Sequence, residues 1–171
     1  MRPLMFSRAS WRPHFFKDEL MKENKPRQRA DYQYFDQVET RWNDNDIYGH
    51  MNNVVYYEMF DSVINRYLIT EGCLNISNGP TAGIIPETRC RYHKPLRFPD
   101  RLDVGLRVTR LGKSSVVYDS SIFRIQDNDA AAECYFVHVF VDRKQQDRPV
   151  PIPDSVRIAL AKIDINQSPS D

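Results

Sequence analysis

The stretch Asp44-Asn45-Asp46-Ile47-Tyr48-Gly49-His50-Met51-Asn52-Asn53, which runs directly into Val54-Val55-Tyr56-Tyr57, decides the fold of this chain. Its first part is rich in Asn, Asp and Gly, residues that favour turns, and it therefore predicts a loop over residues 43–53. After residue 53 the spacing of the apolar residues changes to that of a helix. We expect a loop that leads without interruption into a long helix.

The helix is predicted from Val54 to about Thr70. Its apolar residues recur at helical spacing, and polar residues gather on another stripe. Asn52 or Asn53 can cap its start, because an asparagine side chain accepts hydrogen bonds from the unpaired amides of the first turn. Gly72 lies just past its end, where a residue in the left-handed conformation commonly closes a helix. The apolar stripe consists of Val55, Met59, Val63 and Tyr67.

Outward from the helix, apolar and polar residues alternate with a period of two, which predicts β-strands. Ordered structure is expected to begin near Tyr32, and the first strand to include Trp42. The segment from Ala131 to Val141 is apolar on both faces, as expected of a central strand. The predicted strands comprise residues 38–42, 88–93, 101–108, 115–125 and 131–141.

The C-terminal part adds a short helix, with Asp154 as its cap, to about Ile163. The order of predicted elements is strand, long helix, four consecutive strands and short helix. Strands that follow one another through short turns favour an antiparallel sheet, and the long helix is available to cover it. The pattern thus predicts an α+β domain.

Length and charge exclude several classes of function. The chain of 171 residues has room for one domain, which we place at 32–145, between an N-terminal extension (1–31) and a Pro-rich C-terminal segment with the short helix (146–171). Its 24 Lys and Arg nearly balance 23 Asp and Glu. Binders of nucleic acid or anionic lipid need a basic excess, so neither partner is expected. No stretch approaches the ~20 apolar residues that span a bilayer.

The three cysteines, Cys73, Cys90 and Cys134, lie far apart and form no Cys-x-x-Cys pair. Reduced thiols in an intracellular compartment are the simplest interpretation, with a role in packing rather than as nucleophiles. His93 and His138 are interpreted as ordinary sheet residues, and neither has a partner at metal-ligand spacing. No metal site is therefore expected.

The N-terminal residues 1–17 are basic and rich in aromatic residues, and they contain no acidic residue. This composition fits a mitochondrial transit peptide, although Pro3 and Pro13 weaken the amphipathic helix that such a peptide uses. A disordered or docking arm fits equally well. The protein is expected to be cytoplasmic or mitochondrial.

The loop and helix start resemble the signature of the 4-hydroxybenzoyl-CoA thioesterase family, Asp-x-x-Gly-His-x-Asn-Asn after a strand and before the central helix. The segments Arg91–Asp100 and Arg110–Ser115 also resemble that family, and the likeness covers roughly residues 35–145. It implies a hotdog fold, in which an antiparallel sheet wraps the long helix. It also implies homodimers or homotetramers with active sites at subunit interfaces, and hydrolysis of an acyl-CoA to a carboxylate and CoA.

The resemblance assigns roles to four residues of the loop and the helix start. Asp46 is the implied catalytic carboxylate, as a nucleophile or as a general base on water. The backbone N–H of Asn53 is the implied partner of the developing oxyanion, because amides at a helix N-terminus are unpaired and partly positive. Gly49 lets the chain turn beside the substrate. His50 positions the substrate, tunes Asp46, donates to the thioester oxygen or serves only as a loop residue.

A purely structural role is the alternative for several of these polar residues. An Asp-rich loop before a helix often serves only capping and turns, and Asp44 fits that role better than Asp46. The side chains of Asn52 and Asn53 are expected to be structural, as cap and loop-fixing groups, with direct substrate contact as the alternative. Glu58 and Asp61 rank behind Asp46 as candidate carboxylates, since another branch of hotdog thioesterases carries its carboxylate on the helix.

Coenzyme A carries phosphates, so basic residues are expected near the site. No cofactor is expected, because CoA is part of the substrate. The resemblance places phosphate contacts in the turn that contains Arg110 and Lys113, with the hydroxyl groups of Ser114 and Ser115 as donors. A second basic group comes from the strand before it. Solubility is the alternative explanation for each of these charges. The second group consists of Arg89, Arg91 and Lys94.

Two other functions compete with thioester hydrolysis. A hotdog hydratase also acts on acyl chains with Asp and His, but its loop has a longer Asp-to-His spacing than the four residues from Asp46 to His50. A non-catalytic acyl-CoA-binding protein would keep the fold and lose turnover. The sequence leaves the identity of the acyl group open.

Overall fold

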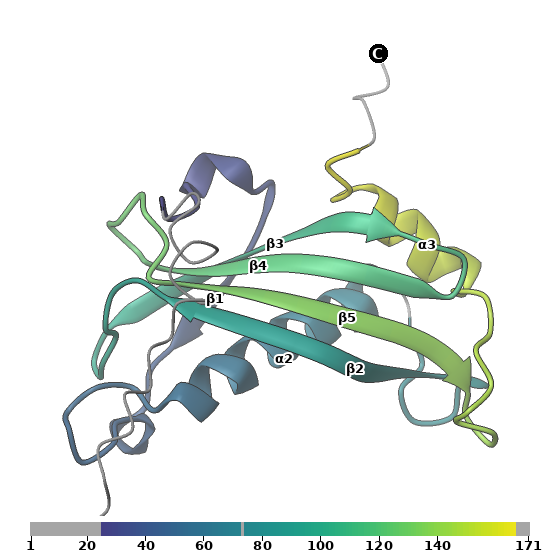
Figure 1. The fold of residues 1–171 in the computed structure, drawn as a ribbon, viewed down its shortest axis with the longest axis horizontal. Coiled ribbons are helices and arrows are strands. Elements are labelled where there is room, and N and C mark those ends of the chain that lie inside the picture. Colours follow the sequence, from purple (N-terminus) through teal and green to yellow (C-terminus); the bar gives the residue numbers. More distant parts are fainter. Residues whose placement is uncertain (1–24, 73, 167–171) are drawn as a thin grey trace, which may run out of the picture.

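The structure is a computed structural model that describes residues 25–72 and 74–166. In this part of the chain an antiparallel sheet is packed against one long helix (Figure 1). The elements are η1 (Arg29–Asp31), β1 (Tyr34–Glu39), η2 (Trp42–Asp44), α2 (Asn53–Thr70), β2 (Thr81–Tyr92), β3 (Arg101–Leu111), β4 (Ser115–Arg124), β5 (Ala132–Asp142) and α3 (Asp154–Ala161). This order confirms the predicted α+β class.

The strand order in the sheet is β1-β3-β4-β5-β2, and every neighbouring pair is antiparallel. The helix α2 runs along one face of the sheet (Figure 1). The strand β5 is an interior strand, as its apolar sequence predicts. The strands β1 and β2 form the two edges of the sheet, so in a single chain β2 has one free side.

The core lies between α2 and the sheet. The helix contributes seven buried side chains, among which Phe60, Val63 and Ile64 are inaccessible to solvent. Tyr67 also donates a hydrogen bond through its hydroxyl to the carbonyl oxygen of Ala159, at 2.7 Å, and so ties α3 to the end of α2. Burial of these large side chains fixes the helix on the sheet, because each contributes on the order of 2 kcal/mol.

The first strand differs from its prediction. It spans Tyr34–Glu39 rather than residues 38–42, and Trp42 lies in the 3-10 turn η2 with 80% of its surface exposed. Pairing with β3 runs out at Glu39, which lies opposite the first residue of β3, Arg101. The alternation beyond Glu39 is therefore not that of a strand.

Gly72 closes the helix differently from the prediction, because it is not in the left-handed conformation. A Cβ atom at this position would lie 2.8 Å from the carbonyl oxygen of Leu68 and 3.3 Å from the Cα of Val156. Glycine is required here by the Leu68 carbonyl oxygen of α2 and, secondarily, by the close approach of α3. Asp154 likewise is not the cap of α3 but its first residue, and Pro153 precedes it.

The strand β2 is longer than predicted, since it begins at Thr81 rather than near Thr88. Its first half contains Pro86, which cannot donate a ladder hydrogen bond. An edge strand tolerates this residue, and the pairing with β5 shifts register between Ile84 and Glu87. Because Pro86 and Gly83 are unusual in strands, the sequence pattern did not predict this half of β2.

Residues 25–31, which the sequence assigns to the N-terminal extension, contact the sheet. The backbone N–H of Arg27 donates to Glu133 at 2.7 Å, and Gln28 forms a β-bridge with Asp129. The arm or transit peptide predicted for residues 1–17 lies outside the described residues, as does Cys73. None of the described helices is long and apolar enough to cross a membrane.

His138 is a buried polar residue of the core. It lies on β5 with 2% of its surface exposed, and neither ring nitrogen has a hydrogen-bond partner among the described residues. Its ring meets that of Tyr118 edge to face, with 5.2 Å between the centroids. Burial disfavours the charged imidazolium and lowers the pKa of His138 to about 4.

We therefore expect acid to destabilise the fold through His138. The unfolded chain binds the proton at the ordinary pKa of 6.5, before the folded protein does, so the free energy of unfolding falls between about pH 6.5 and about pH 4. The loss amounts to as much as about 3 kcal/mol. Urea unfolding measured across this pH range should show a smaller loss in His138→Leu. The exposed His50, changed to Leu, is the matched control and should leave the wild-type slope unchanged.

Candidate active site

The loop before α2 folds back on itself through backbone hydrogen bonds. The Asp46 N–H donates to the His50 carbonyl oxygen at 2.8 Å, and the Gly49 N–H donates to the Asp46 carbonyl oxygen at 3.1 Å. Asn45 and Met51 form a β-bridge at the base of the loop. Gly49 has a φ of +78°, in the left-handed region that favours glycine. The sequence therefore makes a tight turn of defined shape at this point.

The carboxylate of Asp46 is oriented by this turn. Its Oδ1 accepts a hydrogen bond from the Tyr48 N–H at 2.8 Å, which is the Asx-turn pattern. No other contact of this carboxylate to the described residues is a hydrogen bond or an ion pair. One carboxylate oxygen is thus held by the loop, and the other is available to a ligand.

The start of α2 presents one free amide beside this loop. Asn52 is the N-cap, as predicted: its Oδ1 accepts from the Val54 N–H at 3.0 Å and its carbonyl oxygen accepts from the Val55 N–H at 2.9 Å. Asn53, the first helical residue, has no acceptor for its N–H among the described residues. The Asn53 N–H, which the resemblance assigns to the oxyanion, is therefore free to donate to a ligand.

A cavity of about 390 Å³ joins these groups. It brings together four of the predicted site residues, Asp46, His50, Asn53 and Lys94, from the loop, the helix start and the exit of β2. Gly49 shapes the loop without lining the cavity. The other lining residues, which sequence reasoning did not assign to the site, are Met51, Tyr56, Tyr92, His93 and Pro95.

Two tyrosines and one histidine form part of the cavity wall. The rings of Tyr56 and Tyr92 meet edge to face at 5.0 Å, and the Tyr56 hydroxyl accepts from the Leu96 N–H at 3.2 Å. Burial raises the pKa of Tyr56, so its hydroxyl stays protonated. His93 lies one residue beyond β2, and its Nε2 is 2.9 Å from Oε1 of Glu133. This pair fixes the imidazole at the cavity wall.

The other acidic residues near the helix have different roles. Asp44 is almost fully buried and accepts hydrogen bonds from the Arg41 N–H at 2.6 Å and Nε at 2.9 Å, which agrees with its predicted structural role. Glu58 forms an exposed ion pair with Arg41 at 3.1 Å. Burial raises the pKa of Asp61, whose Oδ1 has no partner among the described residues. Neither Glu58 nor Asp61 lines the Asp46 cavity.

Residues 40–160 match the model of the thioesterase-like superfamily, which is well over half of the chain. The chain belongs to this superfamily. The predicted resemblance and the predicted hotdog fold are both confirmed, because the sheet and α2 have the arrangement that this family and its solved members share.

Three known proteins illustrate the relationship. The PA5185 protein of Pseudomonas aeruginosa strain PAO1 has 45% sequence identity and a TM-score of 0.80, over 84% of this chain and 99% of that one. Slr0204, a 1,4-dihydroxy-2-naphthoyl-CoA thioesterase from Synechocystis, shares the fold at 18% identity and a TM-score of 0.69, over 79% of this chain and 98% of its own. The chloroplastic acyl-acyl carrier protein thioesterase ATL3 of Arabidopsis thaliana is 28% identical over 127 residues, or 72% of this chain and 66% of that protein. This chain thus spans slightly less than two thirds of the curated relatives ATL3 and ATL2.

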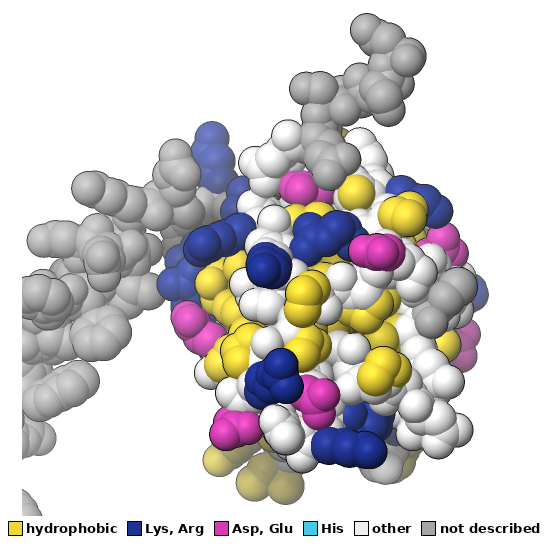
Figure 2. Space-filling view, turned by 90° about the vertical axis from the view of Figure 1, so that its right-hand side faces the viewer, with side chains coloured by type: hydrophobic (Ala, Val, Ile, Leu, Met, Phe, Trp, Pro, Cys, Tyr) yellow, Lys and Arg dark blue, Asp and Glu magenta, His cyan; other side chains and the backbone are white. Residues whose placement is uncertain are grey.

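The turn that carries the predicted phosphate contacts of this thioesterase-like chain lies far from Asp46. The strand β3 starts beside the loop and is 11 residues long, so at ~3.3 Å per residue its far end is about 35 Å away. Arg110, Lys113, Ser114 and Ser115 lie at that far end, where Lys113 accepts from the Ile152 N–H at 2.9 Å. Figure 2 shows this end of the molecule, with Lys and Arg side chains distributed over it. Within one chain these residues do not meet Asp46.

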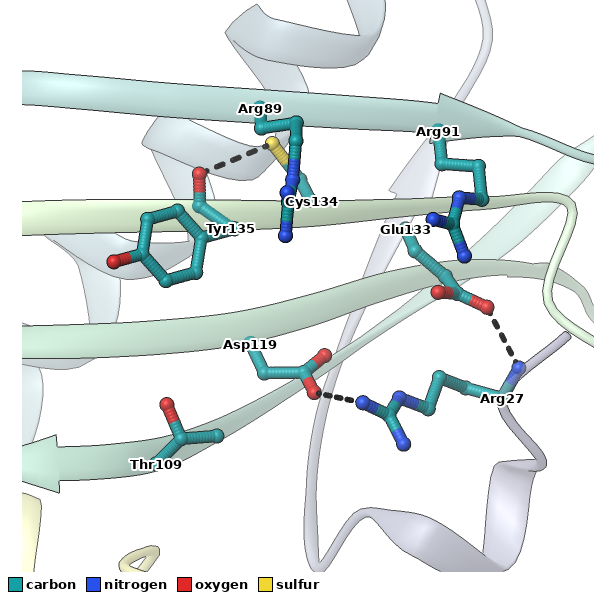
Figure 3. Close-up of a pocket in the computed structure, with 8 residues that line it drawn as sticks. All are labelled: Arg27, Arg89, Arg91, Thr109, Asp119, Glu133, Cys134 and Tyr135. Carbon is teal, nitrogen blue, oxygen red and sulfur yellow. Dashed lines mark hydrogen bonds and ion pairs between the residues drawn. The ribbon is translucent and has the colours of Figure 1, made fainter. Parts of the chain in front are cut away.

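Arg91 and Lys94, predicted as one basic group, are separated by the sheet. Lys94 follows β2 and lines the Asp46 cavity, but Arg91 lies on β2 and lines a second cavity on the outer face (Figure 3). Arg89 lines that second cavity too. Among the described residues, no group of three or more His, Cys, Asp and Glu side chains is placed to hold a metal ion.

We expect Gly49→Ala to destabilise the protein and to displace the Asp46 carboxylate. A Cβ at Gly49 meets no atom within 4 Å, so the cost arises only from the positive φ and amounts to about 1 kcal/mol. Asparagine tolerates this conformation better, so Gly49→Asn should cost about half as much. Urea unfolding measures both changes. Equal stability of the alanine variant and the wild type would contradict the role of this turn.

Proposed function

We propose that this protein is an acyl-CoA thioesterase, which hydrolyses an acyl-CoA to a carboxylic acid and free CoA. The observation that supports the proposal most is the shared cavity of Asp46 and the uncapped N–H of Asn53. Thioester hydrolysis needs a nucleophile or activated water on one side of the carbonyl and a donor for the developing oxyanion. Membership of the thioesterase-like superfamily supports the same reaction.

In this mechanism the thioester carbonyl oxygen accepts from the Asn53 N–H, and the helix dipole adds partial positive charge at that point. The Asp46 oxygen that is not bound to the Tyr48 N–H faces the carbonyl carbon. By the nucleophilic route it forms a mixed anhydride and expels the CoA thiolate, and water then hydrolyses the anhydride. By the general-base route it takes a proton from water, which attacks the carbonyl carbon directly, and the tetrahedral intermediate then expels the CoA thiolate.

His50 and Lys94 line the same cavity and supply positive or hydrogen-bonding groups at its mouth. We assign them to the pantetheine and phosphate part of the substrate, because a phosphate interacts favourably with Lys. A neighbouring cavity of about 360 Å³ is lined by His50, Lys94, Pro95, Arg97 and Arg124, so the basic lining extends away from Asp46. Tyr56 and Tyr92 then face the acyl side of the thioester.

The proposed active site is completed by a second copy of the chain. From Gly83 to Arg89 the edge strand β2 is exposed in one protomer, and an exposed edge favours pairing with another strand. If β2 pairs with its symmetry mate in antiparallel fashion, opposite ends of the two sheets come together. The far-end turn of the partner, with Arg110 and Lys113, is then carried toward the Asp46 cavity and its CoA phosphates.

We expect Asp46→Asn to abolish hydrolysis while the protein stays folded. Asparagine retains the acceptor for the Tyr48 N–H but neither attacks a thioester nor accepts a proton, so kcat/KM should fall by about 100-fold or more. A panel of acyl-CoAs, with thiol release followed over time, measures the loss, and circular dichroism checks the fold. Asp61→Asn, outside the cavity, is the matched control. Undiminished hydrolysis by Asp46→Asn would contradict the proposal.

The same panel separates the competing functions. Acyl chains on acyl carrier protein belong in it, because ATL3 is a thioesterase of such substrates. Hydrolysis of the carrier-bound acyl group alone would replace CoA as the proposed leaving group. Water addition to an enoyl-CoA without thiol release would identify a hydratase, and binding without any reaction would identify a non-catalytic protein.

Subunit mixing tests the shared site. Asp46→Asn damages the loop of one protomer, and Lys113→Ala damages the phosphate turn of the other, so random exchange leaves one complete site in each mixed dimer. At a low acyl-CoA concentration the mixture should recover about a quarter of wild-type activity. A mixture of Asp46→Asn and Asp46→Ala, both changed in the loop, should recover none. No recovery in the first mixture, after exchange is verified by mass spectrometry, would contradict the shared site.

A further inference from the structure

A second cavity, of about 260 Å³, lies on the face of the sheet that points away from α2 (Figure 3). Arg89 and Arg91 border it from β2, and Arg27 borders it from the segment before η1. It shares no lining residue with the Asp46 cavity. The remaining lining residues are Thr109, Asp119, Glu133, Cys134 and Tyr135.

The two carboxylates of this cavity are already bound by other groups. Asp119 accepts from Arg107 Nη2 at 2.8 Å and from the Tyr32 hydroxyl at 2.8 Å, and Arg107 is itself buried. Glu133 accepts from the Arg27 backbone N–H at 2.7 Å and lies 2.9 Å from His93 Nε2. Neither acid therefore depends on the arginines of β2 for its partners.

Arg89 and Arg91 lie two positions apart on one strand, so their side chains share a face. Neither guanidinium forms an ion pair or a hydrogen bond with any residue that the structure describes. Arg89 lies over the ring of Tyr135, 5.7 Å from its centroid, a contact that leaves the N–H edge of the guanidinium free. Glu133 lies opposite Arg91 in the strand register, but it is held by the Arg27 N–H and by His93. The like charges of Arg89 and Arg91 repel each other, and an anion between them removes that repulsion.

We propose that this cavity binds the phosphate group of a small phosphorylated metabolite, with Arg89 and Arg91 as the bridging donors. Guanidinium groups match phosphate oxygens in pairs of parallel hydrogen bonds, which makes arginine the preferred partner of such an anion. Arg27 supplies a third cation at the rim, although its Nη2 also lies 3.3 Å from Asp119. The volume is below the ~300–1,000 Å³ of pockets for drug-sized ligands, so the phosphate end alone is enclosed.

This site is distinct from the proposed substrate site and does not depend on it. The sheet separates the two cavities, and the His93–Glu133 pair connects them, since His93 lines one and Glu133 lines the other. A phosphate beside Glu133 adds negative charge next to this pair. A bound anion should therefore shift the NMR resonances of His93 without entering the Asp46 cavity.

Calorimetric titration with inorganic pyrophosphate and with ADP tests the site. We expect saturable binding whose affinity for both probes is at least about tenfold weaker in Arg89→Ala/Arg91→Ala. Arg101→Ala removes an exposed arginine outside the cavity and should not change the affinity. Thermal melting verifies that each variant is folded, as expected for exposed side chains.

The Lys113→Ala variant distinguishes this site from the proposed CoA turn. Binding that is lost in Lys113→Ala and kept in the double arginine variant would overturn the proposal, and so would the absence of saturable binding in the wild type. Tighter binding of ADP than of pyrophosphate would identify a nucleotide as the source of the phosphate. Equal binding of the two probes would identify the phosphate group alone as the ligand.

Discussion

The candidate site depends on the hydrogen bonds that close the loop before α2 and attach it to its surroundings. The Asp46 N–H meets the His50 carbonyl, and the Asn52 N–H meets the Asp44 carbonyl at 2.9 Å. Burial cannot shape the tip of this loop, because Ile47 and Tyr48 are 92% and 79% exposed. The backbone bonds, together with the buried Asp44, therefore hold the Asp46 carboxylate beside the first amide of the helix.

The core makes this local arrangement rigid. Phe60 and Ile64 bury the helix against the sheet, so the free amide at its start has a fixed position. The Met51 N–H donates to the Leu96 carbonyl oxygen at 2.7 Å, which joins the loop to the connection between β2 and β3. Loop, helix start and strand exit thus form one structural unit, and electrostatic stabilisation of a transition state needs such preorganisation.

The parts of the fold and site that are local in sequence could be predicted. The long helix and its Asn52 cap follow from the spacing of neighbouring residues in the sequence. The same is true of the placement of Asp46, His50 and Asn53 around one cavity, because these residues are also close together in the sequence. Contacts between distant segments could not be predicted from the sequence. Trp42 continues the strand pattern, but β1 has no partner beyond Glu39. His93 looks like a strand residue, and only its position beyond β2 and its pair with Glu133 place it at the cavity.

The exit of β2 explains why one basic segment lines two cavities. Successive side chains of a strand point to opposite faces, so Tyr92 joins the Asp46 cavity while Arg91 points outward. The strand then ends, and Lys94 returns to the inner side. A sequence pattern counts these charges as one group, whereas the pleat of the strand divides them between the two cavities. Because β2 is also the free edge of the sheet, pairing with another subunit would bring both sites close to the same interface.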